Sequence, residues 1–505
     1  MDEIDELIKK YDKNLNSDFR LPSVHSFGEK YSEEGFENIK DVTFREPSKD
    51  EYNNPLSFTT QFYFCPIPLR LDSYSGCQHN CLYCFANTSM QKFIGAKDKR
   101  IVKNYDNVIS TSVKPTSYEA VRKYFDVAFN GKKNTFREQE AIAVECLKRR
   151  VPIHFGGMSD PFQPIEKHKQ VTLSILKVLK SYNYPLIIST KNKLICDNIY
   201  YDILKDYENL KIQVSLIDDR QEIVNMLETG LGTNSVQDRL DIFDKYADKW
   251  TAIRIQPVIP MLTEPRLEQL IILAHNHKVN HVVIEGLKLF TSNKLVNNRI
   301  SEVFKKLTGK PFDLVSYYKS IGATFSGNDL ELPTWRKLEY ILPVKRRIKA
   351  LGNMTLGVAD NDLRLLGDMP CCCGIKEGEK GFENIIKHNI GFSNFRARDK
   401  QVPITYDLIK NEWFPEGNFR SVISVEKLKA KFGEDATYKD ANRKVMDMFM
   451  EQWNNQGKNS PAQMVHVEYK GVDKDNNAIY GVNIEKIIKT KKQTYLGEFS
   501  DEKGK

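Results

Sequence analysis

The sequence contains no run of about 18 or more apolar residues, the length that a membrane-spanning helix requires. Its first residues, MDEIDELIKKYDKNL, are acidic and polar, and they lack the apolar centre of a secretory signal. We therefore expect a cytoplasmic protein that has no membrane partner.

A large excess of one charge is also missing. The 75 Lys and Arg residues against 67 Asp and Glu residues give a net charge of +8 and a pI near 8.7, below the value of about 9 that marks many nucleic-acid-binding domains. The basic residues of the C-terminal third form three groups. They are Lys345, Arg346, Arg347 and Lys349; Arg396, Arg398 and Lys400; and Lys489, Lys491 and Lys492. These groups predict either solvated helix faces or a surface for an anionic partner such as a nucleic acid.

The spacing of a disulfide framework is absent as well. The chain has nine cysteines, an odd number, and most of them fall in two tight groups. One group is Cys77, Cys81 and Cys84, with Cys65 upstream; the other is the run Cys371–Cys373. Clustering of this kind in a large chain favours metal or redox chemistry over disulfides.

A strand–helix pattern repeats from residue 62 to about residue 290. Its short apolar runs cover residues 65–71, 151–155, 185–189, 212–216, 252–258 and 279–284. Polar loops and stretches with helical periodicity separate them, which predicts a parallel sheet with right-handed crossovers. Six such units fit an open barrel better than a closed eightfold one. The predicted fold is therefore α/β, a partial (β/α)6 barrel of the TIM type.

Four regions follow from this pattern. Residues 1–61 are predicted to be an N-terminal extension and residues 62–290 the partial barrel. Residues 291–399 are predicted to be a helical extension, with helices at 298–307, 311–319 and 337–349. Residues 400–505 are predicted to be a small α+β region, with a helix at 440–456 and strands at 464–469 and 478–484.

The segment SGCQHNCLYCFA contains Cys77, Cys81 and Cys84. Iron–sulfur clusters are held by cysteine thiolates, usually four to a cluster, so three cysteines in one loop leave one iron open to an external ligand. A structural zinc site would need four closed ligands, and His79 lies inside the loop between two of the cysteines. The triad therefore predicts a [4Fe–4S] cluster.

The triad spacing, with Tyr83 directly before the third cysteine and a predicted strand ahead of the motif, resembles the signature of the radical S-adenosylmethionine (SAM) superfamily. The resemblance implies that the open iron binds SAM and that an electron cleaves SAM to methionine and a 5′-deoxyadenosyl radical. A flavodoxin- or ferredoxin-type protein is the expected external electron donor. In such enzymes the protein supplies binding, orientation and exclusion of water.

Further segments, over residues 62–290, resemble the subgroup of spore photoproduct lyase and its DNA-repair-photolyase-like relatives. They are HFGGMSDPFQPIE at 154–166, STKN at 189–192, VSL at 214–216, DRL at 238–240 and IRIQPVIP at 253–260. By this resemblance, the residues that contact SAM are Gly156, Gly157, Ser159, Lys191, Ser215 and Arg254.

The chain departs from spore photoproduct lyase after the second predicted strand. That lyase has a hydrogen-donating cysteine there, whereas this chain has Met158, which argues against the same reaction. The run Cys371–Cys373 leaves three alternatives open: a buried structural turn, ligands that join Cys65 at a second cluster, or catalytic thiols that donate hydrogen or act as a redox pair. Tyr83 either relays a radical or packs the cluster loop. Asp360 and Asp362 are predicted to be helix caps.

The leading functional hypothesis is a radical SAM enzyme that abstracts a hydrogen atom from a nucleic acid or nucleotide. One alternative keeps this chemistry but modifies a protein or peptide, with the C-terminal region as a docking module. The other is a non-catalytic iron–sulfur protein.

Overall fold

The computed structural model describes residues 55–59, 65–86, 113–133, 138–230, 232, 234–291, 294–326, 329–387, 389–410, 433–434, 453–455 and 466–488. Most of the predicted N-terminal extension lies outside these residues, as do the predicted helix at 440–456 apart from residues 453–455 and the basic Lys489, Lys491 and Lys492.

The main sheet has eight strands in the order β1-β2-β3-β4-β5-β6-β7-β11. They are β1 (Leu56–Phe58), β2 (Leu69–Leu71), β3 (Ile153–Phe155), β4 (Leu186–Thr190), β5 (Leu210–Ser215), β6 (Trp250–Val258), β7 (His281–Gly286) and β11 (Thr355–Val358). Strands β2 to β7 and β11 are parallel, and β1 pairs with β2 in the antiparallel sense. The α/β prediction is confirmed, and β1 and β11 are the edges of an open sheet in the described part of the chain.

All six predicted barrel strands are present as β2 to β7. The seventh parallel strand, β11, was not predicted, and it comes from the region expected to be a helical extension. Its four residues follow a long helix, and they are too few to show a strand periodicity in the sequence. It joins the sheet because it pairs with β7, with Leu356 opposite Val282.

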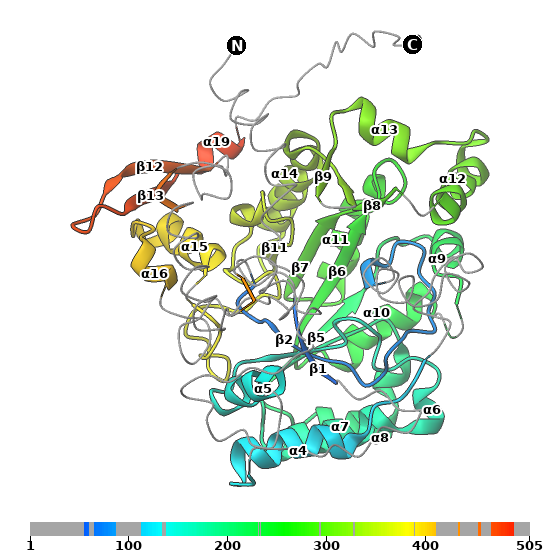
Figure 1. Ribbon diagram of the computed structural model, residues 1–505. Helices are drawn as coiled ribbons and strands as arrows, with labels where there is room; N and C mark the ends of the chain where they lie inside the picture. The colour runs from blue at the N-terminus through cyan, green and yellow to red at the C-terminus, as the bar shows by residue number, and fades with distance from the viewer. Residues whose placement is uncertain are drawn as a thin grey trace, which may run out of the picture.

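Helices connect the strands. The first crossover contains α4 (Tyr118–Phe129) and α5 (Glu138–Lys148). The next connections contain α6 (Glu166–Lys169), α7 (Val171–Ser181), α8 (Asn198–Leu204), α9 (Gln221–Leu227), α10 (Val236–Lys245) and α11 (Leu267–Asn276). Helices α4, α7 and α8 lie together beneath the sheet in the view of Figure 1.

Three helices occupy the predicted helical extension, α12 (Lys294–Thr308), α13 (Leu314–Ser320) and α14 (Thr334–Leu351). A small sheet of β8 (Leu289–Phe290), β9 (Thr324–Ser326) and β10 (Asp329–Glu331) lies among them. Beyond β11 come α15 (Ile390–Lys400), α16 (Tyr406–Lys410), the hairpin of β12 (Val467–Val472) and β13 (Ala478–Val482), and α19 (Ile484–Ile488). Residue Ile404 forms a bridge to Tyr480, which ties this hairpin to the residues after α15.

Side chains alternate between the two faces of the main sheet. One face carries Leu71, Phe155, Ile188 and Ile253, and these pack with helix residues in the large hydrophobic core. The other, which we call the inner face, carries Arg70, His154, Ser189, Gln213 and Arg254. A second hydrophobic cluster lies there and joins Ile187 of β4 to Cys371, Cys373, Ile375 and Phe382. The segment after β11 therefore covers part of the inner face.

No helix in the described ranges combines the length and the apolar character needed to cross a bilayer.

Candidate active site

The three cysteines of the motif lie on the loop that follows β2, which we call the cluster loop (residues 72–86). Cys81 is buried, whereas Cys77 and Cys84 are half-buried. The loop pairs with the end of α9 and the residues that follow it. The Leu82 N–H donates to the carbonyl of Leu227, the last residue of α9, at 2.9 Å, and the Gly230 N–H donates to the His79 carbonyl at 3.0 Å. The approach requires a glycine: a Cβ atom on Gly230 would lie 1.9 Å from the Gln78 oxygen.

A reciprocal pair of glutamines fixes the cluster loop to the segment after β3. The Gln163 Oε1 atom accepts from the Gln78 N–H at 2.8 Å, and Gln163 Nε2 donates to the Gly76 carbonyl at 2.8 Å. The Gln78 Oε1 atom accepts from the Ile165 N–H at 2.7 Å. Ser159, a predicted SAM contact, takes part in the same connection, since its hydroxyl donates to the Tyr74 carbonyl at 2.8 Å. These contacts hold the cluster loop against the segment that follows β3.

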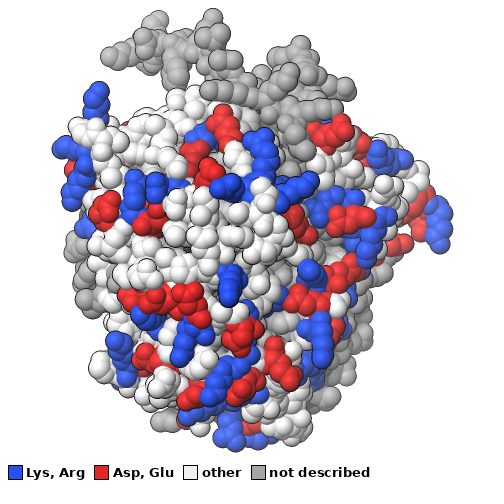
Figure 2. Space-filling model, turned by 180° about the vertical axis from the view of Figure 1, so that it is seen from behind, with Lys and Arg blue, Asp and Glu red and all other residues white. Residues whose placement is uncertain are grey.

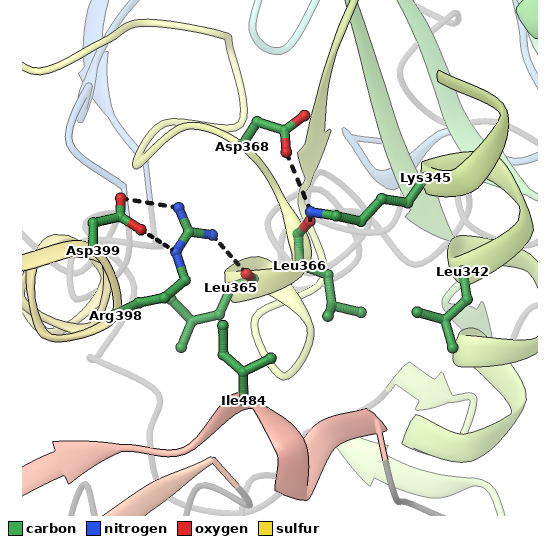
Figure 3. A pocket seen from close by; sticks show the side chains of 8 residues that line it. All are labelled: Leu342, Lys345, Leu365, Leu366, Asp368, Arg398, Asp399 and Ile484. Atoms are coloured by element: carbon green, nitrogen blue, oxygen red, sulfur yellow. Dashed lines mark hydrogen bonds and ion pairs between the residues drawn. The ribbon is translucent and has the colours of Figure 1, made fainter. Parts of the chain in front are cut away.

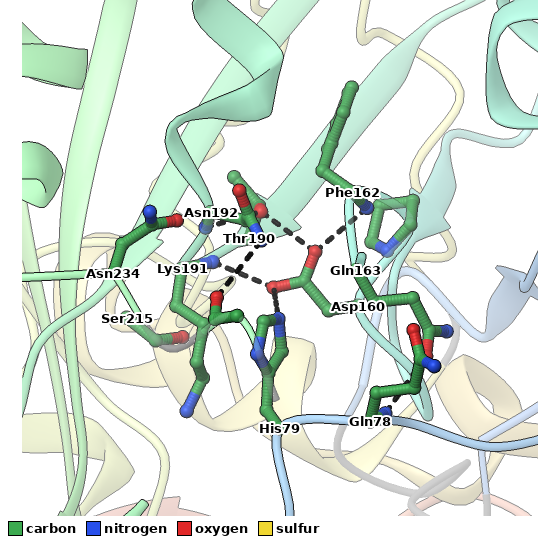
Figure 4. A network of polar contacts seen from close by, with 12 residues as sticks. Gln78, His79, Asp160, Phe162, Gln163, Thr190, Lys191, Asn192, Ser215 and Asn234 are labelled. Carbon is green, nitrogen blue, oxygen red and sulfur yellow. Dashed lines mark hydrogen bonds and ion pairs between the residues drawn. The ribbon is translucent and has the colours of Figure 1, made fainter. Parts of the chain in front are cut away.

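Asp160 connects the cluster loop to the end of β4 (Figure 4). Its Oδ2 atom lies 3.3 Å from His79 Nε2 and accepts the Lys191 N–H at 2.8 Å, while Oδ1 accepts the Thr190 hydroxyl at 2.8 Å. Burial acts to raise the pKa of Asp160, but His79 and the backbone N–H groups outweigh burial and lower it. The carboxylate therefore stays ionised and anchors Lys191 at the carboxyl end of the strand.

The Lys191 side chain reaches the cluster loop. Its Nζ atom lies 3.0 Å from Cys81 Sγ, 3.0 Å from the Tyr83 hydroxyl and 3.1 Å from Glu228 Oε1. Glu228 is fully buried, pairs with the buried Arg239 and accepts a short hydrogen bond from Tyr83. The structure thus places a predicted SAM contact directly against a predicted cluster ligand, with Tyr83 beside them.

The donor set of the cluster loop fits a cubane better than a single ion. No three His, Cys, Asp or Glu side chains in the described residues converge on one metal position. A [4Fe–4S] cubane distributes its cysteines over separate irons, so its ligands need not converge. Burial raises the pKa of Cys81 to about 12, although the Lys191 charge lowers it, so a bound cationic cluster would supply the charge that a thiolate needs there. Cys77, Cys81 and Cys84 would hold such a cluster.

Gly156 and Gly157 bring backbone close to the inner face. Gly156 has φ +87°, and a Cβ atom there would lie 2.4 Å from the Ser189 carbonyl oxygen. A Cβ atom on Gly157 would lie 3.0 Å from Arg70 Cδ. These two contacts explain the paired glycines by the close approach of backbone and side chains.

Gly156→Ala is expected to lower the free energy of unfolding by about 2–4 kcal/mol, because the residue must hold a positive φ and its Cβ meets backbone. The matched control is Gly131→Ala, at φ +67° with nothing within 4 Å of the added Cβ. Chemical denaturation of both variants measures the difference. Equal losses would show that the contact with Ser189 carries no cost.

Ser215 and Arg254 are register partners on the adjacent strands β5 and β6. Ser215 ends β5, and its carbonyl accepts from Arg239 Nη1 at 3.0 Å. The Arg254 side chain lies on the inner face, where it donates to Ser189 Oγ at 2.8 Å and to Gln256 Oε1 at 2.7 Å. Ser189 precedes Lys191 by two residues on β4, so Arg254 contacts a deeper position of that strand than the one from which Lys191 extends.

The run Cys371–Cys373 packs against the inner face together with Cys65. Cys371 and Cys373 are buried, at 0% and 8% exposure, and only Cys372 of the three is partly exposed. The backbone of the run is held by a hydrogen bond, since His281 Nε2 donates to the Cys372 carbonyl oxygen at 2.9 Å. A Cβ on Gly357 would lie 2.4 Å from the same oxygen, which explains a glycine in β11.

The environment of the three thiols differs. Hydrogen bonds from the Cys371 and Cys373 thiols, and then the charges of Arg364 and Arg254, lower the pKa of Cys372. Burial raises the pKa of Cys371. Cys372 therefore differs from Cys371 and Cys373 both in its partial exposure and in the direction of its pKa shift.

Asp360 and Asp362 do not cap a helix, so that prediction was wrong. They pair with the buried Lys337, whose Nζ lies 2.7 Å from Asp362 Oδ1 and 3.4 Å from Asp360 Oδ1. The Gly286 N–H donates to Asp360 Oδ2 at 2.9 Å. The pair therefore joins α14 to the end of β7.

His281 makes stability depend on pH. Burial lowers its pKa to about 4, and because Nε2 donates to a carbonyl, Nδ1 accepts the Thr355 hydroxyl at 2.7 Å in the neutral form. A lowered histidine pKa means that the unfolded chain binds the proton first, so stability is lost as the pH falls from about 6.5 toward about 4, by up to about 3 kcal/mol.

His281→Gln is expected to flatten the dependence of the unfolding free energy on pH between about pH 7 and pH 5. The control is His275→Gln, at a less buried histidine that lies 2.8 Å from Asn353 Oδ1. An unchanged slope in the His281 variant would contradict this assignment.

In the described part of the C-terminal third, basic residues that form ion pairs are Lys345, Arg347, Arg396, Arg398 and Lys400. Arg396 and Lys400 both contact Glu377, at 2.8 Å, and Arg398 contacts Asp399. Figure 2 shows Lys and Arg interspersed with Asp and Glu over the face that it presents.

A cavity of about 510 Å³ lies between α14, the residues after β11, α15 and α19. The two cationic side chains that line it both have partners. Lys345 Nζ lies 3.2 Å from Asp368 Oδ1, and Arg398 donates to the Leu365 carbonyl at 2.7 Å (Figure 3). Asp399, which pairs with Arg398, and Leu342, Leu366 and Ile484 complete the lining, so each charged side chain of the cavity has a partner of opposite charge.

Sequence reasoning missed four residues that position the site. Asp160 and Gln163 lie inside the segment at 154–166, so their polarity beside a predicted strand was the available signal. Neither His79 nor Glu228 had a signal beyond its residue type, because their partners come from distant parts of the chain.

No protein-family model and no curated protein matches this chain. Solved structures with a similar arrangement include a spore photoproduct lyase mutant with bound AdoMet and dinucleoside spore photoproduct, at TM-score 0.39 and 14% identity over 59% of this chain and 78% of that one. They also include SuiB of Streptococcus suis bound to S-adenosylmethionine, at TM-score 0.30 and 10% identity over 49% and 48%. A third is the radical S-adenosylmethionine methyltransferase TsrM of Kitasatospora setae, at TM-score 0.36 and 12% identity over 66% and 60%. All three TM-scores are below 0.5.

Proposed function

We propose that this chain is a radical SAM enzyme whose [4Fe–4S] cluster is held by Cys77, Cys81 and Cys84 at the edge of a partial barrel. The observation that carries the proposal is the contact of 3.0 Å between Lys191 Nζ and Cys81 Sγ, which joins the cysteine motif to the end of a parallel strand. When bound, the cluster supplies the electron that cleaves SAM to methionine and a 5′-deoxyadenosyl radical.

The residues around the cysteine motif bind and orient SAM. Lys191 supplies a cation for the SAM carboxylate, and Glu228 holds that cation in place through its contact of 3.1 Å. We assign Gly156 and Gly157, which follow β3, and Ser215, at the end of β5, to contacts with the methionine end of SAM. Tyr83 donates to Glu228 and packs beneath Lys191, so its role is positioning.

Cys372 is our candidate for thiol chemistry in the reaction. It is partly exposed on the inner face, its pKa is lowered, and Cys371 and Cys373 flank it as neutral thiols. Once protonated, the Cys372 thiol would donate a hydrogen atom to a substrate radical, and the thiyl radical left on Cys372 would be returned to the thiol by one electron from the proposed flavodoxin- or ferredoxin-type donor and one proton.

The proposed substrate is a nucleic acid or nucleotide, and the proposed electron donor is a flavodoxin- or ferredoxin-type protein. A protein or peptide substrate is the alternative. Anaerobically reconstituted protein with dithionite and SAM, screened against DNA, RNA and small proteins, is expected to release 5′-deoxyadenosine fastest with a nucleic acid. Deuterium transfer from labelled substrate into the deoxyadenosine identifies the abstracted hydrogen.

Nucleic-acid affinity is expected to fall steeply as salt increases, because phosphate contacts release counterions. Affinity that does not depend on salt would favour the peptide alternative. An absence of SAM cleavage under any condition would favour the non-catalytic alternative.

A further inference from the structure

Two arginines on the inner face lack a carboxylate partner. Arg70 donates to Thr59 Oγ1 at 3.0 Å and to Met158 Sδ at 3.3 Å, and Arg254 donates to Ser189 and Gln256. Over the ranges that the structure describes, neither arginine forms an ion pair. By contrast, the buried Arg239 and Arg336 each pair with a glutamate. A half-buried cation without a counter-ion is costly unless a ligand supplies the missing charge.

The two arginines belong to one site. Arg70 and His154 are register partners on adjacent strands, and Arg254 Nη1 lies 3.4 Å from His154 Nε2. Burial, followed by the charges of Arg254 and Arg70, lowers the pKa of His154, which is therefore neutral and compensates neither cation.

The nearby carboxylates are occupied by other groups. The charge of Asp72 acts to raise the pKa of Arg70, but the Asp72 Oδ1 atom accepts hydrogen bonds from the Met158 and Ser159 N–H groups at 2.9 and 3.0 Å. Gln256 stands between Arg254 and Glu285, with its Nε2 atom 3.2 Å from Glu285 Oε2. Asp72 and the Cys372 thiol therefore offset part of the positive charge of the site, but in the described residues neither forms an ion pair with Arg70 or Arg254.

A third donor lies beside Arg254. The side chain of Gln213 is fully buried and its Nε2 atom has no hydrogen-bond partner. Its Oε1 atom accepts from Ser189 Oγ at 3.1 Å, and Ser189 is also the acceptor of Arg254. An unused buried donor costs about 1–3 kcal/mol, which a hydrogen-bond acceptor in the ligand would recover. The site is therefore rich in donors and requires an accepting, anionic ligand.

We propose that Arg70, Arg254 and Gln213 form a subsite for a phosphate group of the substrate, next to Cys372. The inference deepens the proposed function and rests on it. A phosphate suits this site better than a carboxylate does, because the donors come from β2, β5 and β6 and a phosphate presents oxygens in more than one plane. Arg254, which would bind the phosphate, is also one of the charges that lower the pKa of the Cys372 thiol. A nucleotide held there would lie beside Cys372.

The test is the dissociation constant of the full-length protein for inorganic phosphate and for a dinucleoside monophosphate, measured by titration calorimetry. Arg254→Gln and Arg70→Gln are each expected to weaken binding by about 10- to 100-fold, the range for a charge-assisted hydrogen bond. The control is Arg122→Gln, an arginine on α4 with 60% side-chain exposure. If Arg254→Gln does not fold, Arg254→Lys keeps the charge and is expected to retain part of the affinity.

A second measurement reports on the position of the ligand. Phosphate is expected to slow alkylation of Cys372 by iodoacetamide, followed by mass spectrometry of the Cys372 peptide, and to have no such effect in Arg254→Gln. Protection that persists in Arg254→Gln would contradict the subsite.

Four further outcomes would overturn the inference. Phosphate binding that is unchanged in Arg254→Gln shows that the ion binds elsewhere. Acetate or an acidic dipeptide that competes as strongly as phosphate assigns the site to a carboxylate. An equal loss of SAM and phosphate affinity in Arg254→Gln assigns the arginine to the cofactor. SAM cleavage without phosphate binding rejects this inference alone, whereas phosphate binding without SAM cleavage rejects the proposed function.

Discussion

Cys81→Ala is expected to reduce the iron bound after anaerobic reconstitution from about four atoms per chain to near zero, because it removes the most buried of the three thiols. Two cysteines cannot hold a cubane whose fourth iron is left for SAM. Iron analysis and the visible absorbance of the cluster measure the loss.

The matched control is Cys196→Ala, which removes a half-buried thiol after β4 that lies outside both cysteine groups. It is expected to retain the full iron content. Iron near four atoms in the Cys81 variant would contradict the assignment of the triad, and it would point to a second cluster at Cys65 and the run Cys371–Cys373.

Glu228→Ala is expected to lower the unfolding free energy by about 3–5 kcal/mol, the second large effect, because it leaves the fully buried Arg239 without a counter-ion. The same change frees Lys191, which loses its contact of 3.1 Å with the carboxylate. Chemical denaturation of the protein without cofactors measures the loss.

Glu222→Ala is the control, since this glutamate lies exposed in the first turn of α9, the helix that leads to Glu228. Its effect is expected to stay below about 0.5 kcal/mol. The double variant Glu228→Ala with Arg239→Met is expected to recover part of the stability because it removes the unpaired charge. Additive losses would contradict the pairing as the cause.

The strands that the sequence predicts well are those whose signal is local. Residues 253–256 alternate between apolar and polar positions, Ile253 and Ile255 against Arg254 and Gln256, and the structure extends the predicted run at 252–258 into β6 (Trp250–Val258). The four residues of β11 carry no such signal, and their place is decided by pairing with β7. A short strand at the edge of a sheet is specified by its neighbour rather than by its own periodicity.

The candidate site divides in the same way. Cys77, Cys81, Cys84 and Lys191 stand in short motifs that can be read from the sequence. Glu228 does not, because its ties to Tyr83 and Arg239 depend on how α9 and α10 meet the cluster loop. The position of Arg254 along β6 and the contact of Cys372 with His281 likewise depend on the register of the sheet. Such contacts form only when distant segments pack.

The most direct test of the account is SAM cleavage by the wild-type protein after anaerobic reconstitution and reduction with dithionite, with Cys81→Ala and Cys196→Ala in parallel. The account predicts release of 5′-deoxyadenosine by the wild type and by Cys196→Ala, and none by Cys81→Ala. Cluster-loaded wild-type protein that releases no 5′-deoxyadenosine, or a Cys81 variant that releases it at the wild-type rate, would contradict the account.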